Sequence, residues 1–212
     1  MGLSGGRGLL QAVKASTTSR YPVLSIPVGR PVEALLRPVV TREGSLVADD
    51  VRSLTEWRNQ CVQAFLTEFH ATEKRTARWL TETVGPDDTR ILFMIDDAWG
   101  RTFGYMGLAF IDWPHGSAEA DAVVRGATAA PGTMTRALRT MLQWAQVQLG
   151  LRTFGVRVRS DNTALAFYRK FGFCEVRRVP LRKVECADMV SWVEDPSLPP
   201  VEPRLVHMLL PE

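Results

Sequence analysis

A tyrosine in the stretch SDNTALAFYRKFGF (residues 160–173) is the first candidate for chemistry. Asp161 or Asn162 can cap the short helix that this stretch predicts, and Gly172 can end it. Packing explains the phenylalanines, but Tyr168 carries a hydroxyl that needs a partner when its ring is buried. A free phenol has a pKa of about 10, so Tyr168 could donate a proton at neutral pH. The alternative is that Tyr168 only packs.

Proton acceptors are the next residues of interest. Glu119 and Asp121 alternate along AEADAVV (118–124), so a strand there would turn both side chains to one face. Either carboxylate could act as a general base, and so could His115 in the preceding turn. The alternatives are a polar strand face and a solvated histidine. No Ser/His/Asp or Cys/His arrangement stands out, so nothing in the sequence requires a covalent intermediate.

A glycine-bearing loop, RGATAAPG (125–132), opens directly onto a predicted helix. Gly132 lets a ligand approach the backbone, and the first-turn amides together with the helix dipole form an anion site suited to phosphate or pyrophosphate. Arg125 and Arg136 could add charge-assisted contacts. The alternative is a plain start signal for a helix.

The composition is that of a globular protein, with 45% hydrophobic and 23% charged residues in a chain of 212. The net charge of +3 and the isoelectric point near 9.0 could attract phosphate-bearing small molecules, but they fall short of a nucleic-acid footprint. The basic residues are nearly all arginine, which indicates a compositional bias or, in part, anion recognition.

The cysteines and apolar runs bear on location. Cys61, Cys174 and Cys186 have no C-x-x-C spacing, so we expect neither a zinc site nor a disulfide framework. No apolar run reaches the roughly 18 residues of a membrane span, and the first residues lack a signal-peptide core. These features favour a cytoplasmic protein.

The hydrophobic pattern predicts the elements that must position these residues. We expect a flexible or loosely packed extension over residues 1–33 and one domain over 34–212. Apolar and alternating runs predict strands at 35–40, 90–96, 102–112, 118–124, 153–159, 174–184 and 204–210. Helical spacing predicts helices from near residue 51 to 66, at 72–80, at 134–149 and within 160–173. Because hairpins follow one another, the fold class is α+β (mixed α/β) with a mostly antiparallel central sheet.

The glycine loop with its helix, the following strand and the motif S-D-N-x-A-x-A-F-Y-x-x-x-G-F together resemble the GCN5-related N-acetyltransferase (GNAT) superfamily, over roughly residues 35–184. The resemblance implies a sheet whose fourth and fifth strands, here 118–124 and 153–159, splay apart and hold acyl-CoA between them. It also implies acyl transfer to an amine by direct attack. No metal is implied.

The same resemblance assigns roles to individual residues. Tyr168 would protonate the departing thiolate, and Asn162 would line the cofactor cleft. Backbone groups of the fourth strand would pair with the pantetheine arm, and amides of the loop would hold the pyrophosphate, which implicates Val123, Val124, Gly132, Thr133 and Met134. The family's loop usually begins with a Gln or Arg that this chain lacks at Ala129, and Arg125 is the candidate replacement.

A subgroup that acetylates amino sugars resembles this chain in VVRG (123–126) and LTEWRN (54–59). The first match favours Asp121 slightly over Glu119 as the base. The second suggests that Trp57, Arg58 and Asn59 contact the acceptor, although a place in the core is the favoured interpretation for Trp57.

The leading hypothesis is an N-acyltransferase that moves an acetyl group from acetyl-CoA to a small polar amine, such as an amino sugar or a natural-product intermediate. One alternative is an aminoacyl-tRNA as the acyl donor, which the arginines and the atypical loop motivate. Another is a non-catalytic domain that binds a ligand or partner. A monomer and a homodimer are both compatible with the sequence.

Overall fold

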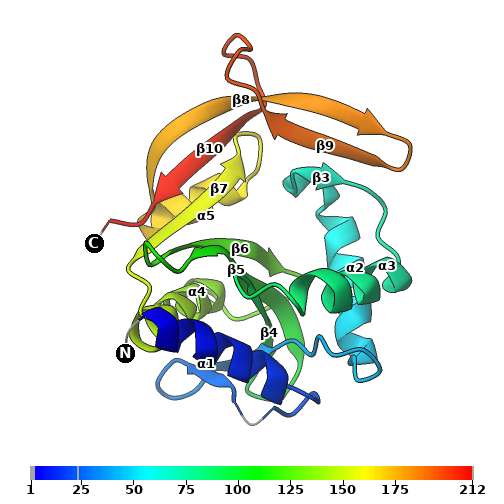
Figure 1. The fold of residues 1–212 in the computed structure, drawn as a ribbon, viewed down its shortest axis with the longest axis vertical. Coiled ribbons are helices and arrows are strands. Elements are labelled where there is room, and N and C mark those ends of the chain that lie inside the picture. Colours follow the sequence, from blue (N-terminus) through cyan, green and yellow to red (C-terminus); the bar gives the residue numbers. More distant parts are fainter. Residues whose placement is uncertain (1–2, 23, 212) are drawn as a thin grey trace.

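The computed structural model describes residues 3–22 and 24–211. Within them, ten strands form one sheet in the order β1-β2-β4-β5-β6-β7-β10-β8-β9-β3 (Figure 1). The strands are β1 (Ile26–Val28), β2 (Ala34–Pro38), β3 (Thr67–Glu68), β4 (Ile91–Asp97), β5 (Thr102–Asp112), β6 (Ser117–Arg125), β7 (Thr153–Arg159), β8 (Cys174–Cys186), β9 (Met189–Glu194) and β10 (Arg204–Leu209). The helices are α1 (Leu3–Ser16), α2 (Ala48–Gln60), α3 (Glu73–Trp79), α4 (Thr133–Trp144) and α5 (Ala164–Phe171), with single turns η1 (Val62–Ala64), η2 (Leu80–Val84) and η3 (Ala145–Leu149).

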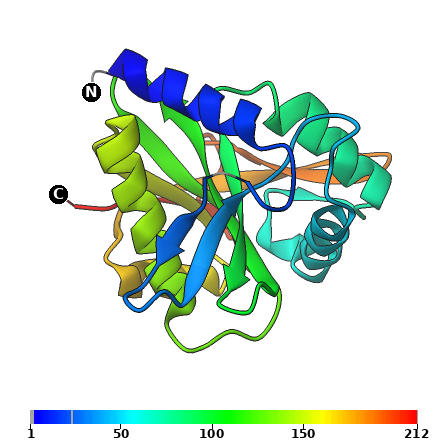
Figure 2. The same cartoon turned by 90° about the horizontal axis from the view of Figure 1, so that it is seen from below.

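Helices cover both faces of the central sheet, and the alternation of β4 shows why. Ile91, Phe93 and Ile95 join a core that contains residues of α1 and α4. Leu92 and Met94 point the other way, into a core that contains residues of α2 and η2. Figure 2 shows α1 and α4 on one side of the sheet and α2 and α3 on the other. The mixed, mostly antiparallel fold that the sequence predicted is confirmed.

The two strands predicted to splay are the parallel pair β6 and β7. They pair only through Ser117, Ala118 and Glu119 on β6 and Thr153, Phe154 and Gly155 on β7, within the described residues. Beyond that point β6 stays with β5 through Arg125, whereas β7 stays with β10 through Arg159. The sheet therefore opens between the second half of β6 and the second half of β7.

A bulge shapes β6 at this opening. Gly107 of β5 pairs with Asp121, but Tyr105 pairs with Val124, so β6 has one residue more than β5 between the two pairs. Ala122 lies in the bulge with a φ of 53°, in the left-handed region that residues with a Cβ rarely adopt. The bulge changes the direction of the strand just where its neighbour leaves it.

The amino-terminal segment differs from our expectation of a loosely packed extension over residues 1–33. Residues 3–16 form α1, in which Leu10 and Val13 are buried, and residues 26–28 form β1 on the edge of the sheet. The helix comes very close to η3: a Cβ on Gly6 would lie 2.1 Å from the carbonyl oxygen of Leu149. The apolar run LLQAV (9–13) is too short to predict a helix by its periodicity, and the glycines and serines around it favour a loop.

The predicted helix from 51 to 66 is also corrected. It begins at Ala48 and ends at Gln60, and the chain continues into η1 and the short strand β3. Asp50 does not cap this helix, because its carboxylate accepts hydrogen bonds of 2.8 and 2.9 Å from the buried guanidinium of Arg37. Arg37 also donates to Asp96 at 2.7 Å, so a buried ion network joins α2 to β2 and β4.

A long hairpin of β8 and β9 arches over the opening in the sheet (Figure 1). Its far strand pairs with β3, Thr67 with Ser191 and Glu68 with Val190. The segment between α2 and α3 is thus tied to the hairpin, although more than a hundred residues separate them in sequence. No helix among the described residues combines the length and apolar character needed to cross a membrane.

Candidate active site

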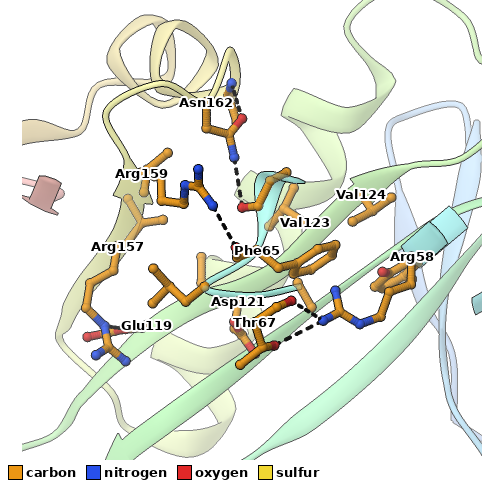
Figure 3. Close-up of a pocket in the computed structure, with 18 of the residues that line it drawn as sticks. Arg58, Phe65, Thr67, Glu119, Asp121, Val123, Val124, Arg157, Arg159 and Asn162 are labelled. Carbon is orange, nitrogen blue, oxygen red and sulfur yellow. Dashed lines mark hydrogen bonds and ion pairs between the residues drawn. The ribbon is translucent and has the colours of Figure 1, made fainter. Parts of the chain in front are cut away.

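A cavity of about 620 Å³ lies in the opening between β6 and β7. One wall comes from β6 and β7, and the facing wall comes from α2, α3 and the η1–β3 segment. Figure 3 shows Glu119, Asp121, Val123 and Val124 of β6 in this cavity, with Arg58 and Thr67 beside them and Arg157 and Arg159 of β7 opposite.

Tyr168 lines the cavity, although only 5% of its surface is exposed. The N-terminal part of α5 is set by Asn162, whose side-chain oxygen accepts a hydrogen bond of 2.8 Å from the amide of Ala164. Edge-on contacts with Phe167 and Phe173 then fix the phenol ring. Burial, together with the nearby charge of Asp121, raises the pKa of Tyr168 above the usual value. The phenol therefore stays protonated at neutral pH.

The two predicted carboxylates both line the cavity, but their surroundings differ. Glu119 accepts a hydrogen bond of 2.6 Å from Arg157 of β7 and forms an ion pair with it. Asp121 has no ion pair among the described residues. His115, the third candidate base, is exposed and bonds to Asp112 at 2.8 Å. Of these groups, Asp121 is the carboxylate that is free to accept a proton in the cavity.

The residues predicted to hold the acyl arm also meet here. Val123 and Val124 line the cavity, and beyond Glu119 their strand has no neighbour on the β7 side within the described chain. An unpaired strand edge presents N–H and C=O groups to whatever lies beside it. Asn162 lines the same cavity and donates a hydrogen bond of 3.2 Å to the carbonyl of Ala64.

The predicted phosphate loop lies outside this cavity, at the start of α4. Gly132 has a φ of 80° and occupies the N-cap position. Thr133 is buried, and both its amide and its hydroxyl bond to the carbonyl of Ala130, which fixes the shape of the loop. Arg136 reaches back to Glu33 and to the loop carbonyl of Pro131.

The remaining loop residues bear on whether an anion fits there. Arg125 is exposed at the end of β6, whereas the side chain of Met134 packs against the core and leaves only its amide for a ligand. A helix N-terminus with a left-handed glycine and an arginine beside it suits a pyrophosphate. The residues present therefore fit the diphosphate of CoA.

The three residues predicted to contact the acceptor are separated by the structure. Arg58 lines the cavity. Trp57 is buried, stacked on Tyr105 and so close to Gly126 that a Cβ there would overlap its ring. Asn59 uses its side chain to bond the amide and the carbonyl of Ala71. In the described part of the chain, the side chains of Trp57 and Asn59 do not line the cavity. They make the contacts that hold α2 in place instead.

Several cavity residues escaped the sequence analysis. Tyr105 of β5 lines the cavity, and burial raises its pKa above the usual value. Arg159 is buried at the end of β7, where it pairs with Asp161 at 2.8 Å and with Glu68 of β3. Glu68 also accepts a bond of 2.7 Å from Trp192 of β9. Alternation along TFGYMGLAFID (102–112) and TFGVRVR (153–159) could have singled out Tyr105 and Arg159, but nothing local places β3 and β9 beside them.

This arrangement is suited to acid–base chemistry in a cleft lined by both apolar and charged side chains. A protonated phenol and a free carboxylate line one cavity, next to an open strand edge that can hold an extended chain. The neighbouring helix begins with a left-handed glycine, a kind of helix N-terminus that suits an anion.

Comparison with known proteins gives one family and several similar folds. A family model described as an acetyltransferase (GNAT) domain matches residues 44–174. No curated protein sequence matches the chain.

Among solved structures, a probable acetyltransferase of the GNAT family from Chromobacterium violaceum is 20% identical, with a TM-score of 0.65 over 90% of this chain and 92% of that one. A GCN5-related N-acetyltransferase from Brucella melitensis is 18% identical, with a TM-score of 0.63 over 90% of this chain and 80% of that one. Spermidine N-acetyltransferase from Vibrio cholerae, solved with CoA and spermine, is 16% identical, with a TM-score of 0.63 over 84% of this chain and 95% of that one. At these identities the likeness shows the fold.

Proposed function

The chain belongs to the acetyltransferase (GNAT) family, and on that premise we propose that it moves an acetyl group from acetyl-CoA to a primary amine of a small polar acceptor. The observation that carries this proposal is the separation of β6 and β7 after Glu119, with Tyr168 and Asp121 lining the cavity that results. An extended pantetheine arm would lie along the open edge of β6 at Val123 and Val124. Its diphosphate would bind at the start of α4.

The proposed reaction needs one base and one acid. Asp121 accepts a proton from the ammonium form of the acceptor, and the free amine attacks the thioester carbonyl. The new C–N bond forms and the C–S bond breaks, while Tyr168 gives its proton to the departing thiolate. The proton that the acylated nitrogen then loses returns the Tyr168 phenolate to the phenol. The phenol suits this role because burial keeps it protonated, and Asp121 suits its role because no arginine pairs with it among the described residues. Glu119 is held by Arg157 and shapes the wall.

Binding of the donor is the first test. CoA or acetyl-CoA at about 100 times its Kd should raise the melting temperature by roughly 5–10 °C, since binding only the folded state adds about 2.7 kcal/mol. Gly132→Ala should weaken CoA binding, because the N-cap needs a φ of 80°. Gly150→Ala is the matched control: Gly150 has a φ of 76° at the far end of the same helical segment, so it should lower stability without weakening CoA binding. No melting shift with either CoA compound would remove the proposal.

The acceptor is tested with a panel of amines and mass spectrometry of the products. Glucosamine represents the amino sugars that the sequence suggested, and spermidine represents the polyamines, because a similar fold was solved with spermine. An aminoacyl-tRNA donor is a second possibility that the arginine content motivated. Product formation from acetyl-CoA alone, unchanged by RNase, would exclude a tRNA donor.

A further inference from the structure

The charges that line the cavity are unequal. Among the described residues they are five arginines and two carboxylates, namely Arg58, Arg75, Arg90, Arg157 and Arg159 with Glu119 and Asp121. Four of the arginines have a carboxylate partner: Arg75 pairs with Asp188, Arg90 with Asp87, Arg157 with Glu119, and Arg159 with Asp161 and Glu68. Arg58 has no such partner within the described chain.

The guanidinium of Arg58 is nevertheless held firmly. Its Nη2 donates to the carbonyl and the hydroxyl of Thr67 at 2.6 and 3.0 Å. It also lies over the rings of Phe65 and Phe69, at 4.1 and 4.3 Å from their centres. Its Nη1 is buried and has no hydrogen-bond partner in the described structure. An unpaired donor of this kind is costly unless a ligand accepts from it.

The surroundings of Arg58 add to that cost. Burial lowers the pKa of its guanidinium; Tyr105 opposes this shift, and Arg75 adds a smaller effect in the same direction as burial. An anion bound to the guanidinium from the cavity would offset the burial of this charge. Asp121 lines the same cavity, has the opposite charge and forms no ion pair with any described residue (Figure 3). Among the residues that the structure describes, the cavity thus offers one cation and one anion without an ion-pair partner.

We propose that the acceptor is an amine that also carries a carboxylate or phosphate group, with the anionic group bound by Arg58 and the amine at Asp121. This inference rests on the proposed acetyl transfer and specifies its substrate class. The planar guanidinium, oriented by two rings, can bind an oxyanion that Lys could only attract as a point charge. A polyamine would bring positive charge alone to a wall where arginines outnumber carboxylates.

The test uses acceptors in matched pairs that differ in the anionic group. Leucine is compared with leucinamide, and glucosamine 6-phosphate with glucosamine; spermidine is measured alongside. Release of CoA from acetyl-CoA gives kcat/KM for each. In at least one pair, we expect kcat/KM to be about tenfold or more higher for the anionic member. The pair that shows this preference tells whether the bound group is a carboxylate or a phosphate. Arg58→Gln should lower kcat/KM for that member by about 10- to 100-fold and remove the preference. Arg58→Lys should keep part of the preference, because Lys attracts an anion only as a point charge.

Arg52→Gln is the control, since Arg52 is an exposed arginine of the same helix that pairs with Asp49 at 3.0 Å. It changes the net charge equally and should leave the preference intact. Equal rates within both pairs, a preference for spermidine, or an Arg58→Gln enzyme that still discriminates would each overturn the inference and leave acetyl transfer standing. If no acceptor turns over, the melting temperature is measured with each compound in the presence of CoA. The anionic member of a pair should then raise it more than the neutral member. Loss of CoA binding itself would instead count against the proposed function.

Discussion

Tyr168 shows how a single side chain can be both a core residue and a candidate acid. Its ring packs edge-on between Phe167 and Phe173 in the main core, yet the residue also lines the cavity. The same packing raises its pKa and fixes its direction. The sequence could identify Tyr168, because a phenol is an unusual choice for a purely apolar position.

We expect Tyr168→Phe to lower kcat by about 100-fold while the Kd for CoA changes little, because the substitution removes a proton donor and keeps the ring. Single-turnover kinetics and calorimetric titration with CoA provide the two measurements.

Tyr105→Phe gives the informative comparison, since Tyr105 is as deeply buried and lines the same cavity. Tyr21, which is 86% exposed, provides the neutral Tyr→Phe control. Should Tyr105→Phe lose turnover and Tyr168→Phe keep it, the acid would be Tyr105.

The site depends on how β6 and β7 part, and the sequence predicted this only in outline. The runs at 118–124 and 153–159 match the two strands closely. The bulge at Ala122 was not foreseen, because an alanine in an alternating run carries no signal of a left-handed backbone. The bulge appears only in the register between β5 and β6, which is a property of the sheet and not of the segment.

The bulge makes a stability prediction at position 122. Ala122→Val should lower the free energy of unfolding by about 1–3 kcal/mol, because a β-branched residue is strained at positive φ. Ala122→Gly should be close to neutral, since the relief of strain offsets the greater freedom of the unfolded chain. Urea denaturation checks both. A valine variant as stable as the parent would mean that the left-handed backbone at this position is absent.

On the scale of the whole molecule, the amino-terminal helix is part of the packed structure. The ammonium of Lys14 donates to the carbonyls of Val84, Asp87 and Arg90, and Arg7 pairs with Asp88. These bonds join α1 to the turn that leads into β4. Such contacts between distant segments leave no trace in local patterns, which explains why α1, β3 and β9 were missed while α4 and the central strands were predicted.

Lys14 gives this docking a pH dependence. Burial lowers its pKa from 10.5 to about 8, so between these values the unfolded chain binds more protons than the folded one. The contribution of Lys14 to stability therefore rises as pH increases from 8 to 10.5. The free energy of unfolding of the protein, minus that of the Lys14→Met variant, should therefore increase from pH 8 to pH 10.5.

Gln11→Met is the control for that measurement, because Gln11 is an exposed residue of α1 with no titrating group. Its difference from the parent should not change with pH. A Lys14→Met difference that stays flat between pH 8 and 10.5 would contradict the buried position of the ammonium.

The place of β10 in the sheet has a consequence for how the protein is made. Residues 204–209 follow every other strand in sequence, yet they lie between β7 and β8. While a ribosome is still adding those residues, β7 has only three paired residues on one side and nothing on the other. At that stage the edge of β7 that later pairs with β10 is exposed, and it can pair with strands of neighbouring chains. Chaperone protection until residues 204–209 have been made should therefore matter more for this protein than its final sheet would suggest.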